Sequence, residues 1–147
     1  MAANNRNITS ANATGVIVVE DIFPSGITLD TFATDAALAL DEETIAETRM
    51  GVDGKMVYGY VPSIKVLTIT LEPVSNAAKG LDVVAATSRL NMNAYSCSLT
   101  FSVPALKQVW TFNNGVLKTL KSVPDVKKVL DIRTFKFDFE SIDIQDV

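Results

Sequence analysis

Two stretches of the chain alternate between apolar and polar residues, and each predicts a β-strand with one buried face. In the first, over residues 95–103, polar residues separate Tyr95, Cys97, Leu99, Phe101 and Val103. In the second, predicted as a long final strand over residues 129–144, polar residues separate Phe135, Phe137 and Phe139. Because successive side chains of a strand point to opposite faces of its sheet, each row predicts a wall of the hydrophobic core.

Shorter signals predict three further strands and one helix. A β-branched run indicates a strand over residues 15–21, alternation indicates strands over 27–33 and 64–72, and Pro24-Ser25-Gly26 indicates a turn between the first two. Ser75 is a typical N-cap for a helix over residues 75–90, whose apolar stripe consists of Ala78, Leu81, Val84 or Ala85, and Ser88. Residues 34–44 fit both a helix and a strand, and this alternative stays open.

Two glycine-containing segments predict hairpins. Gly51-Val52-Asp53-Gly54 lies between residues 44–50 and 55–62, and its Asp-Gly pair favours a type I′ turn, in which both central residues have positive φ. Asn113-Asn114-Gly115 lies between residues 109–112 and 116–121 and predicts a second hairpin. Neither strand of the first hairpin has an apolar face of its own. We therefore expect that hairpin to project from the domain and to pack against another chain.

Strands outnumber helices along the chain and are mostly sequential neighbours. The economical fold is therefore mainly β, with two packed antiparallel sheets or a closed barrel and one helix on the outside. Residues 14–147 predict a single domain without internal repeats. The asparagine-rich residues 1–13 are typical of a flexible N-terminal arm.

The composition weakens most enzyme classes. The 147 residues contain no His, and Cys97 is the one cysteine, so the sequence lacks the commonest general base and cannot form a thiolate metal cluster. Cys97 lies in an apolar row, which indicates a buried, unreactive thiol. The sequence also contains no phosphate-binding glycine loop and no nucleophile elbow. We therefore expect a non-enzymatic protein without cofactor or metal.

Charge is divided unevenly along the chain. Residues 1–60 contain 9 acidic and 3 basic side chains, whereas residues 61–147 contain 8 acidic and 10 basic ones. This division indicates either a merely dipolar surface or two parts that attract one another when copies stack. The sequence shows neither a secretory signal nor an apolar run of the roughly 20 residues that span a bilayer, so we expect no stable membrane insertion.

The order of these elements, the Met50-Gly51-Val52-Asp53-Gly54-Lys55 hairpin and the closing Phe-rich strand resemble a tail tube protein of contractile-tailed bacteriophages, over residues 14–145. The resemblance implies two roughly orthogonal antiparallel sheets with a flanking helix. It also implies six-membered rings that stack into a tube inside a contractile sheath and conduct viral DNA without specific binding. The implied location is the virion, after synthesis in the host bacterial cytoplasm. The implied partners are further copies of the chain and the sheath, baseplate and tail terminator proteins.

The resemblance also implies functional residues. The hairpin would reach a neighbouring subunit through Arg49, Met50, Gly51, Asp53, Gly54 and Lys55, and the 1–13 arm would contact the adjacent ring. A DNA conduit needs a channel wall that does not hold phosphates, and lysine and arginine are the residues that hold them. We therefore expect an acidic or neutral channel wall, supplied mainly by the first half of the chain. The candidate lumen residues are Asp41, Glu42, Glu43 and Glu47.

Two alternatives remain open from the sequence. One is a baseplate or tail-completion protein with the same fold. The other is a monomeric β-barrel that holds a small apolar ligand inside. The second alternative predicts an interior cavity and a monomer, whereas the tube and baseplate interpretations predict assembly.

Overall fold

The two alternating rows lie in one large antiparallel sheet. The computed structural model describes residues 13–29 and 38–146. In chain order these residues form β1 (Thr14–Val19), β2 (Phe23–Thr28), β3 (Leu38–Leu40), β4 (Ala46–Met50), β5 (Met56–Tyr60), β6 (Lys65–Leu71), α1 (Asn76–Asn91), β7 (Cys97–Val103), β8 (Gln108–Leu120) and β9 (Arg133–Asp146). Seven strands pair in the order β2-β1-β7-β8-β9-β6-β3, and β4 and β5 form a separate two-stranded sheet.

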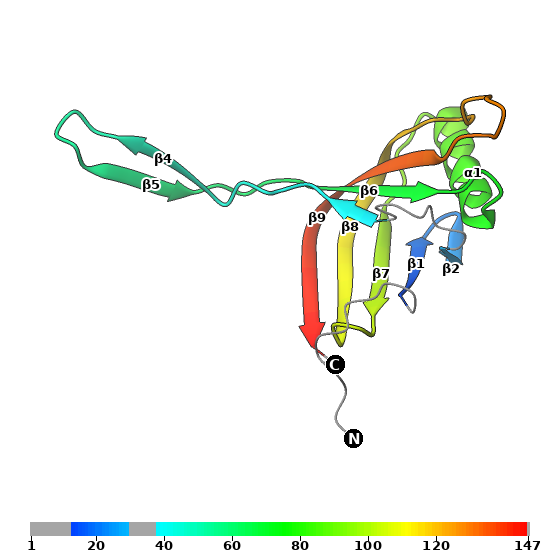
Figure 1. Ribbon diagram of the computed structural model, residues 1–147, viewed down its shortest axis with the longest axis horizontal. Coiled ribbons are helices and arrows are strands. Elements are labelled where there is room, and N and C mark those ends of the chain that lie inside the picture. The colour runs from blue at the N-terminus through cyan, green and yellow to red at the C-terminus, as the bar shows by residue number, and fades with distance from the viewer. Residues whose placement is uncertain (1–12, 30–37, 147) are drawn as a thin grey trace, which may run out of the picture.

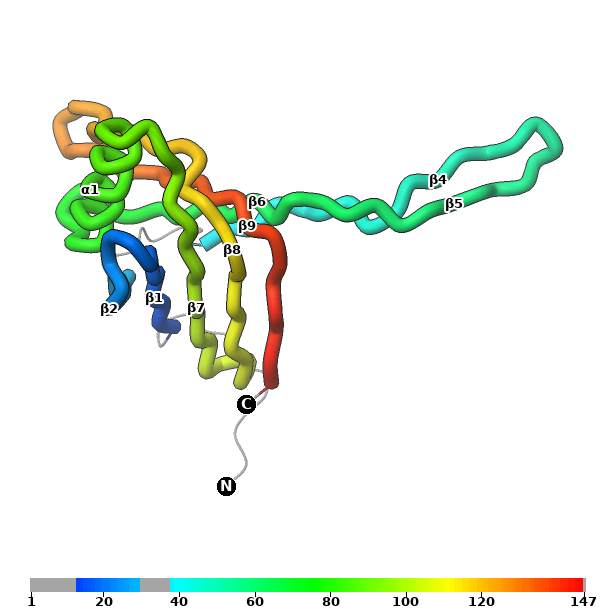
Figure 2. Tube along the Cα trace, turned by 180° about the vertical axis from the view of Figure 1, so that it is seen from behind, coloured from blue at the N-terminus to red at the C-terminus, as the bar shows by residue number. Residues whose placement is uncertain are grey.

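The seven-stranded sheet is strongly bent. In Figure 1, β6 runs across the direction of β7 and of the second half of β9, and α1 lies at the end of the body near β1 and β2. The view from behind in Figure 2 shows β4 and β5 extending away from the body on the opposite side. The predicted mainly-β fold, with two antiparallel sheets and one flanking helix, is confirmed. The second of these sheets is the projecting hairpin.

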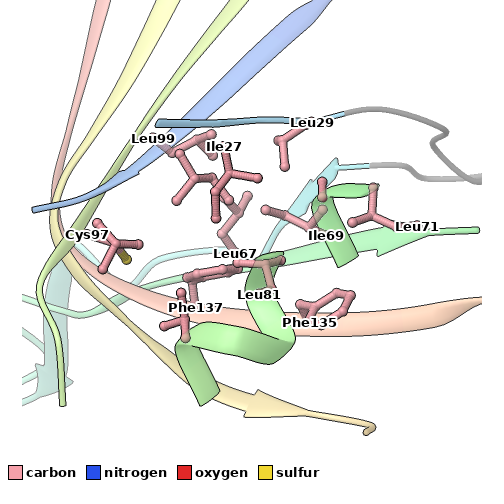
Figure 3. Close-up of a cluster of buried hydrophobic side chains, with 14 of the residues drawn as sticks. Ile27, Leu29, Leu67, Ile69, Leu71, Leu81, Cys97, Leu99, Phe135 and Phe137 are labelled. Atoms are coloured by element: carbon pink, nitrogen blue, oxygen red, sulfur yellow. The ribbon is translucent and has the colours of Figure 1, made fainter. Parts of the chain in front are cut away.

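The hydrophobic core is built on one face of the bent sheet. Phe135, Phe137 and Phe139 are at most 1% exposed, as the alternation predicted. Figure 3 shows Leu81 of α1 lying beside Leu67 and Phe137, so the helix closes the core from one side. Full burial of each large apolar side chain contributes about 1.5–3 kcal/mol, so this row is a main source of stability.

The helix begins and ends as its sequence predicts. The hydroxyl oxygen of Ser75 accepts a hydrogen bond from the Ala78 N–H at 3.4 Å, and this contact caps the first turn. At the other end Met92 takes a left-handed conformation with φ 49°, and its N–H donates to the Ser88 carbonyl. The predicted stripe is buried at its alanine, leucine and valine positions, and Ser88 is half-buried.

A buried arginine ties the helix to the final strand. The guanidinium of Arg133 donates to both carboxylate oxygens of Asp82 in α1, at 2.8 and 2.6 Å, and two of its nitrogens also donate to the Lys121 carbonyl. The same group lies 5.0 Å from the centre of the Phe135 ring. A bidentate, charge-assisted pair of this kind fixes both distance and orientation. Arg133 therefore sets where α1 sits above the sheet.

The first two strands are shifted from their predicted positions. The turn falls at residues 20–22, where the Ile22 N–H donates to the Val19 carbonyl, and Pro24-Ser25-Gly26 lies inside β2. β2 is an edge strand, and proline is tolerated there because its missing N–H can face away from the sheet. In the ambiguous segment, Leu38–Leu40 form a strand. Residues 1–12 and 30–37 lie outside the described residues. They include most of the predicted N-terminal segment 1–13 and the predicted end of the second strand.

The predicted Asn113-Asn114-Gly115 hairpin is wrong. These residues lie within one continuous strand, β8, at an irregularity in its pairing with β7. Asn114 has φ 51°, and its side-chain amide donates to Glu140 on β9 and accepts from the Ser96 hydroxyl. A bulge uses the same residue types as a turn, because both need a left-handed residue. The predicted final strand also begins later than expected, at Arg133 instead of residue 129.

A side chain at position 115 should disturb the packing measurably. A Cβ atom at this position would lie 2.2 Å from Cδ1 of Phe139 and 2.8 Å from the Asp138 carbonyl oxygen. Gly115→Ala should therefore lower the free energy of unfolding by about 1–3 kcal/mol in urea titrations followed by circular dichroism. Gly59→Ala is the matched control, because a Cβ there meets nothing within 4 Å. Equal midpoints for both variants would contradict this packing account.

Candidate functional site

The β4–β5 hairpin projects from the body as an extended arm. In Figures 1 and 2 it reaches far beyond the other elements, and the two strands pair with each other to form their own sheet. All ten residues of the two strands are exposed. An isolated two-stranded sheet is at best marginally stable in water. The arm therefore gains little stability from its own packing.

Backbone hydrogen bonds close the turn at the tip of the hairpin. The Gly51 N–H donates to the Lys55 carbonyl at 2.8 Å, and the Gly54 N–H donates to the Gly51 carbonyl at 3.0 Å. Gly54 has φ 82°, whereas Val52 and Asp53 keep negative φ. The hairpin prediction is confirmed, but the type I′ turn is wrong. A three-residue loop closes the hairpin, with its single left-handed residue at glycine.

The strand register gives the arm two different faces. The pairs Ala46–Tyr60, Thr48–Tyr58 and Met50–Met56 lie on one face, and Glu47–Gly59 and Arg49–Val57 lie on the other. Directly paired residues point the same way, so the first face is largely apolar and the second carries the charges. The expectation that the hairpin lacks an apolar face is therefore wrong. It arose because each strand was considered without its partner.

The predicted interface residues do lie together, at the outer end of the arm. Arg49, Met50, Gly51, Asp53, Gly54 and Lys55 occupy the end of β4 and the turn. The Lys55 N–H donates to the side chain of Asp53 at 3.2 Å, so this aspartate orders the turn. Their proposed contact with a neighbouring subunit stays a prediction.

The predicted lumen residues occupy the root of the same arm. Asp41, Glu42 and Glu43 connect β3 to β4, and Glu47 lies on β4 opposite Gly59. The carboxylate of Glu43 is 3.1 Å from the ammonium of Lys65, which also donates to the Ser63 carbonyl. The backbone N–H of Asp41 donates to the Val66 carbonyl and anchors the root to β6. Their position in a channel stays a prediction.

A second exposed surface lies at the opposite end of the body and was missed in the sequence. We call the outer side of α1 together with residues 121–132 the loop surface. Its exposed apolar residues include Val83, Leu90, Met92, Val123, Val126, Val129 and Leu130. The sequence assigned residues 129–132 to the final strand. Apolar residues such as Val129 and Leu130 are typical of a buried strand, but in the structure both side chains are exposed.

The loop surface is ordered by local polar contacts. Lys121 pairs with Asp125, and Lys127 lies 3.3 Å from Asp131. The backbone N–H of Ile132 and the nearby ammonium of Lys127 hold the pKa of Asp131 below its usual range. Arg89 at the end of α1 donates to the Ser122 hydroxyl at 3.3 Å. These contacts order the loop internally and join it to α1, while Val126 and Val129 remain exposed.

The sheet also has strand edges without a partner among the described residues. β6 pairs with residues 133–139 of β9, so residues 140–146 pair on one side only, with β8. The terminal strands of the sheet are β2 at one edge and the short β3 at the other. Unpaired edges invite a further strand from another chain.

One face of the sheet near these edges is polar and almost uncharged. Thr100 of β7 pairs with Thr111 of β8, and Thr111 pairs with Asp143 of β9, so the three side chains lie side by side. Ser102, two residues after Thr100 on β7, lies on the same face. The amide of Asn113 donates to Asp143 at 3.0 Å. Hydroxyl and amide groups therefore dominate this surface, which we call the hydroxyl face.

Cys97 is buried, and burial raises the pKa of its thiol to about 12, so the nucleophilic thiolate is suppressed. Within residues 13–29 and 38–146, no group of three metal-ligating side chains gathers. In the same part of the chain, no helix has the length and apolar character required to cross a bilayer.

Comparison with known families gives one match over most of the chain. A family model described as tail fiber protein gp32 matches residues 6–143. No curated protein matches the sequence.

Solved structures share the fold. A chain of the anti-feeding prophage baseplate, 6-fold symmetrised, has a TM-score of 0.67 at 13% identity, covering 100% of this chain and 99% of that one. A chain of the PVC sheath/tube terminator from an extracellular contractile injection system has a TM-score of 0.62 at 11% identity, covering 97% and 99%. A chain of the anti-feeding prophage tube terminating cap gives 0.55 at 10% identity, covering 100% and 95%. The resemblance to tail tube proteins is thus confirmed at the level of the fold.

The exposure of the arm predicts that it can be shortened without harm to the core. Replacing residues 48–57 with a short Gly-Ser link should change the free energy of unfolding by less than about 0.5 kcal/mol, because the removed side chains are exposed. The same variant should fail to form large assemblies in analytical ultracentrifugation, with the full-length chain as control. An unfolded variant would show that the arm belongs to the core.

Proposed function

Because this chain belongs to the tail fiber protein gp32 family, whose model spans residues 6–143, we propose that it is a structural subunit that forms stacked rings of an inner tail tube. The rings are six-membered and contain copies of this chain alone. The protein is not an enzyme. It works as a passive conduit in the tail of a virion, for DNA that passes without specific binding, and is made in the host bacterial cytoplasm.

One observation carries this proposal: the body has unpaired strand edges, and an arm leaves on one side of it. Residues 140–146 of β9 lie on the side of the arm, whereas β2 lies on the side of α1 (Figure 1). Pairing of one chain's β9 edge with the next chain's β1–β2 side is a head-to-tail contact. Such contacts close into rings when the rotation per subunit permits it. The edges that endanger a monomer are then satisfied by neighbours.

The structural neighbours support the choice of partners. They come from a sheath/tube terminator, a tube terminating cap and a 6-fold symmetrised baseplate. We therefore propose that the tube contacts a sheath protein, a baseplate and a terminator. A single ring in the baseplate or terminator remains a second candidate function, since those neighbours share the fold over nearly the whole chain.

The monomeric ligand-binding barrel receives less support. The space enclosed by the sheet and α1 is filled by large side chains that are at most 1% exposed, among them Phe135, Phe137 and Leu81. A ligand inside would have to displace this packed core, at a cost of several kcal/mol.

The ring also suggests which surface lines the channel. The core and α1 make one side of the subunit thick, and the circumference of a ring grows with its radius, so the thick side belongs outside. The hydroxyl face lies on the other side of the sheet and would then face the channel. The residues that define this face, Thr100, Ser102, Thr111 and Asp143, include no lysine or arginine, and Lys118, farther along β8, lies 3.4 Å from Asp138. A wall without cations lets phosphates pass.

The first test of this proposal is assembly itself. We expect purified protein to form rings or hollow tubes in negative-stain electron microscopy, and species far above 15.9 kDa in ultracentrifugation at high concentration. Long tubes would favour the tube over a single-ring role in the baseplate or terminator. A 15.9 kDa species at every concentration and salt would refute both candidates.

A second test concerns the channel wall. Tubes of a Thr100→Lys/Thr111→Lys variant should assemble and retain double-stranded DNA in a salt-dependent manner, because each lysine adds a phosphate contact. The matched variant Asp41→Lys/Glu42→Lys tests the acidic segment in the same assay. Retention by the second variant alone would place the wall at the acidic segment. Retention by neither would contradict both assignments.

A further inference from the structure

We infer that the arm of one copy docks on the loop surface of the next copy, with the apolar face of the β4–β5 hairpin against the apolar side chains of residues 121–132 and α1. The inference rests on the proposed self-assembly and names the surface of the neighbour that receives the arm. A second copy of this chain is the occupant.

The first argument is where exposed apolar side chains gather. One group lies on the arm and its root: Ile45, Met50, Val52, Met56, Val57, Tyr58, Tyr60 and Ile64. A second group lies on the loop surface, including Met92 at 92%, Val126 at 85% and Val129 at 79% exposed. Concentrated apolar patches on a protein surface mark sites of association. Two such patches on one chain can cover each other.

The second argument is that the two patches cannot meet within one chain. In both views the arm extends from the body on the side of β9, and α1 and the 121–132 loop lie on the opposite side (Figures 1 and 2). Contact between them therefore requires two copies in a head-to-tail arrangement. Pairing of the β9 edge with the neighbour's β1–β2 side also joins the arm side of one copy to the α1 side of the next. One head-to-tail arrangement can therefore form both contacts.

The third argument is charge. The arm and its root, residues 41–64, carry five carboxylates and two cations. The loop surface carries the cations Lys79, Arg89, Lys121, Lys127 and Lys128 against three carboxylates. Of these carboxylates, Asp125 pairs with Lys121, Asp131 with Lys127, and Asp82 with Arg133. Opposite charges on the two patches favour the head-to-tail contact and disfavour arm against arm.

The contact predicts a specific loss of assembly. Val126→Asp/Val129→Asp places two carboxylates in the apolar part of the loop surface, and both positions are exposed, so the fold should be unchanged. We expect the concentration needed for ring or tube formation to rise at least about tenfold, because two carboxylates would then be buried against the apolar face of the arm. Leu106→Asp is the matched control, since Leu106 is exposed in the turn between β7 and β8, away from the loop surface (Figure 1).

A cross-linking experiment identifies the contact directly. Copies carrying Tyr58→Cys are mixed with copies carrying Val126→Cys or, as control, Leu106→Cys, and treated with a flexible bis-maleimide. The native Cys97 stays silent because it is buried. Covalent dimers should form with the Val126→Cys copies and not with the Leu106→Cys copies. If the wild-type chain assembles while Val126→Asp/Val129→Asp assembles equally well, or while the cross-link is absent, the docking inference fails and the tube proposal stands. If the wild-type chain never assembles, the tube proposal fails first.

Discussion

The backbone of Gly115 lies against the ring of Phe139, at the level where β8 and β9 change which positions they bury. Along β8 the buried residues Phe112 and Gly115 are three positions apart instead of two, and along β9 the core contacts pass from Phe139 to Ile142 with the same spacing. The left-handed residue Asn114 provides this change, and only a glycine next to it lets the phenylalanine ring approach. The second half of β8 and the first half of β9 can then join the core with β6. The first half of β8 and the second half of β9 extend beyond β6, where β9 has a free edge.

That division explains why one chain offers both a packed core and open edges. β6 pairs with β9 only up to Phe139, and its partner β3 is short, so the sheet ends abruptly where β9 bends away. The chain between β3 and β6 does not fold back over the open edge. It leaves the body as the β4–β5 arm. Stability is therefore concentrated in the core, whereas the exposed edges and the arm are left for association.

Self-association through opposite sides of the subunit would explain both the open strand edges and the exposed arm. The arm and the β9 edge lie on one side, and the loop surface and the β1–β2 side lie on the other (Figure 2). A chain with complementary but different surfaces on its two sides adds copies in one direction, which leads to a ring or a filament. The family assignment and the fold shared with components of contractile injection systems agree with a structural role.

The sequence by itself determined the elements whose signals are local: the rows of Leu99 and Phe137, the Ser75 cap with its helix, and the presence of a hairpin at Gly54. It also located the exposed arm that became the candidate site. Only the tertiary structure decided that Asn113-Asn114-Gly115 is a bulge, because turns and bulges require the same left-handed residue and differ only in what pairs beside them. The apolar face of the arm depends on the register between two strands, which neither strand contains alone. The loop surface at Val126 and Val129 likewise depended on the tertiary structure, because exposure is set by what packs over a residue and not by the residue itself.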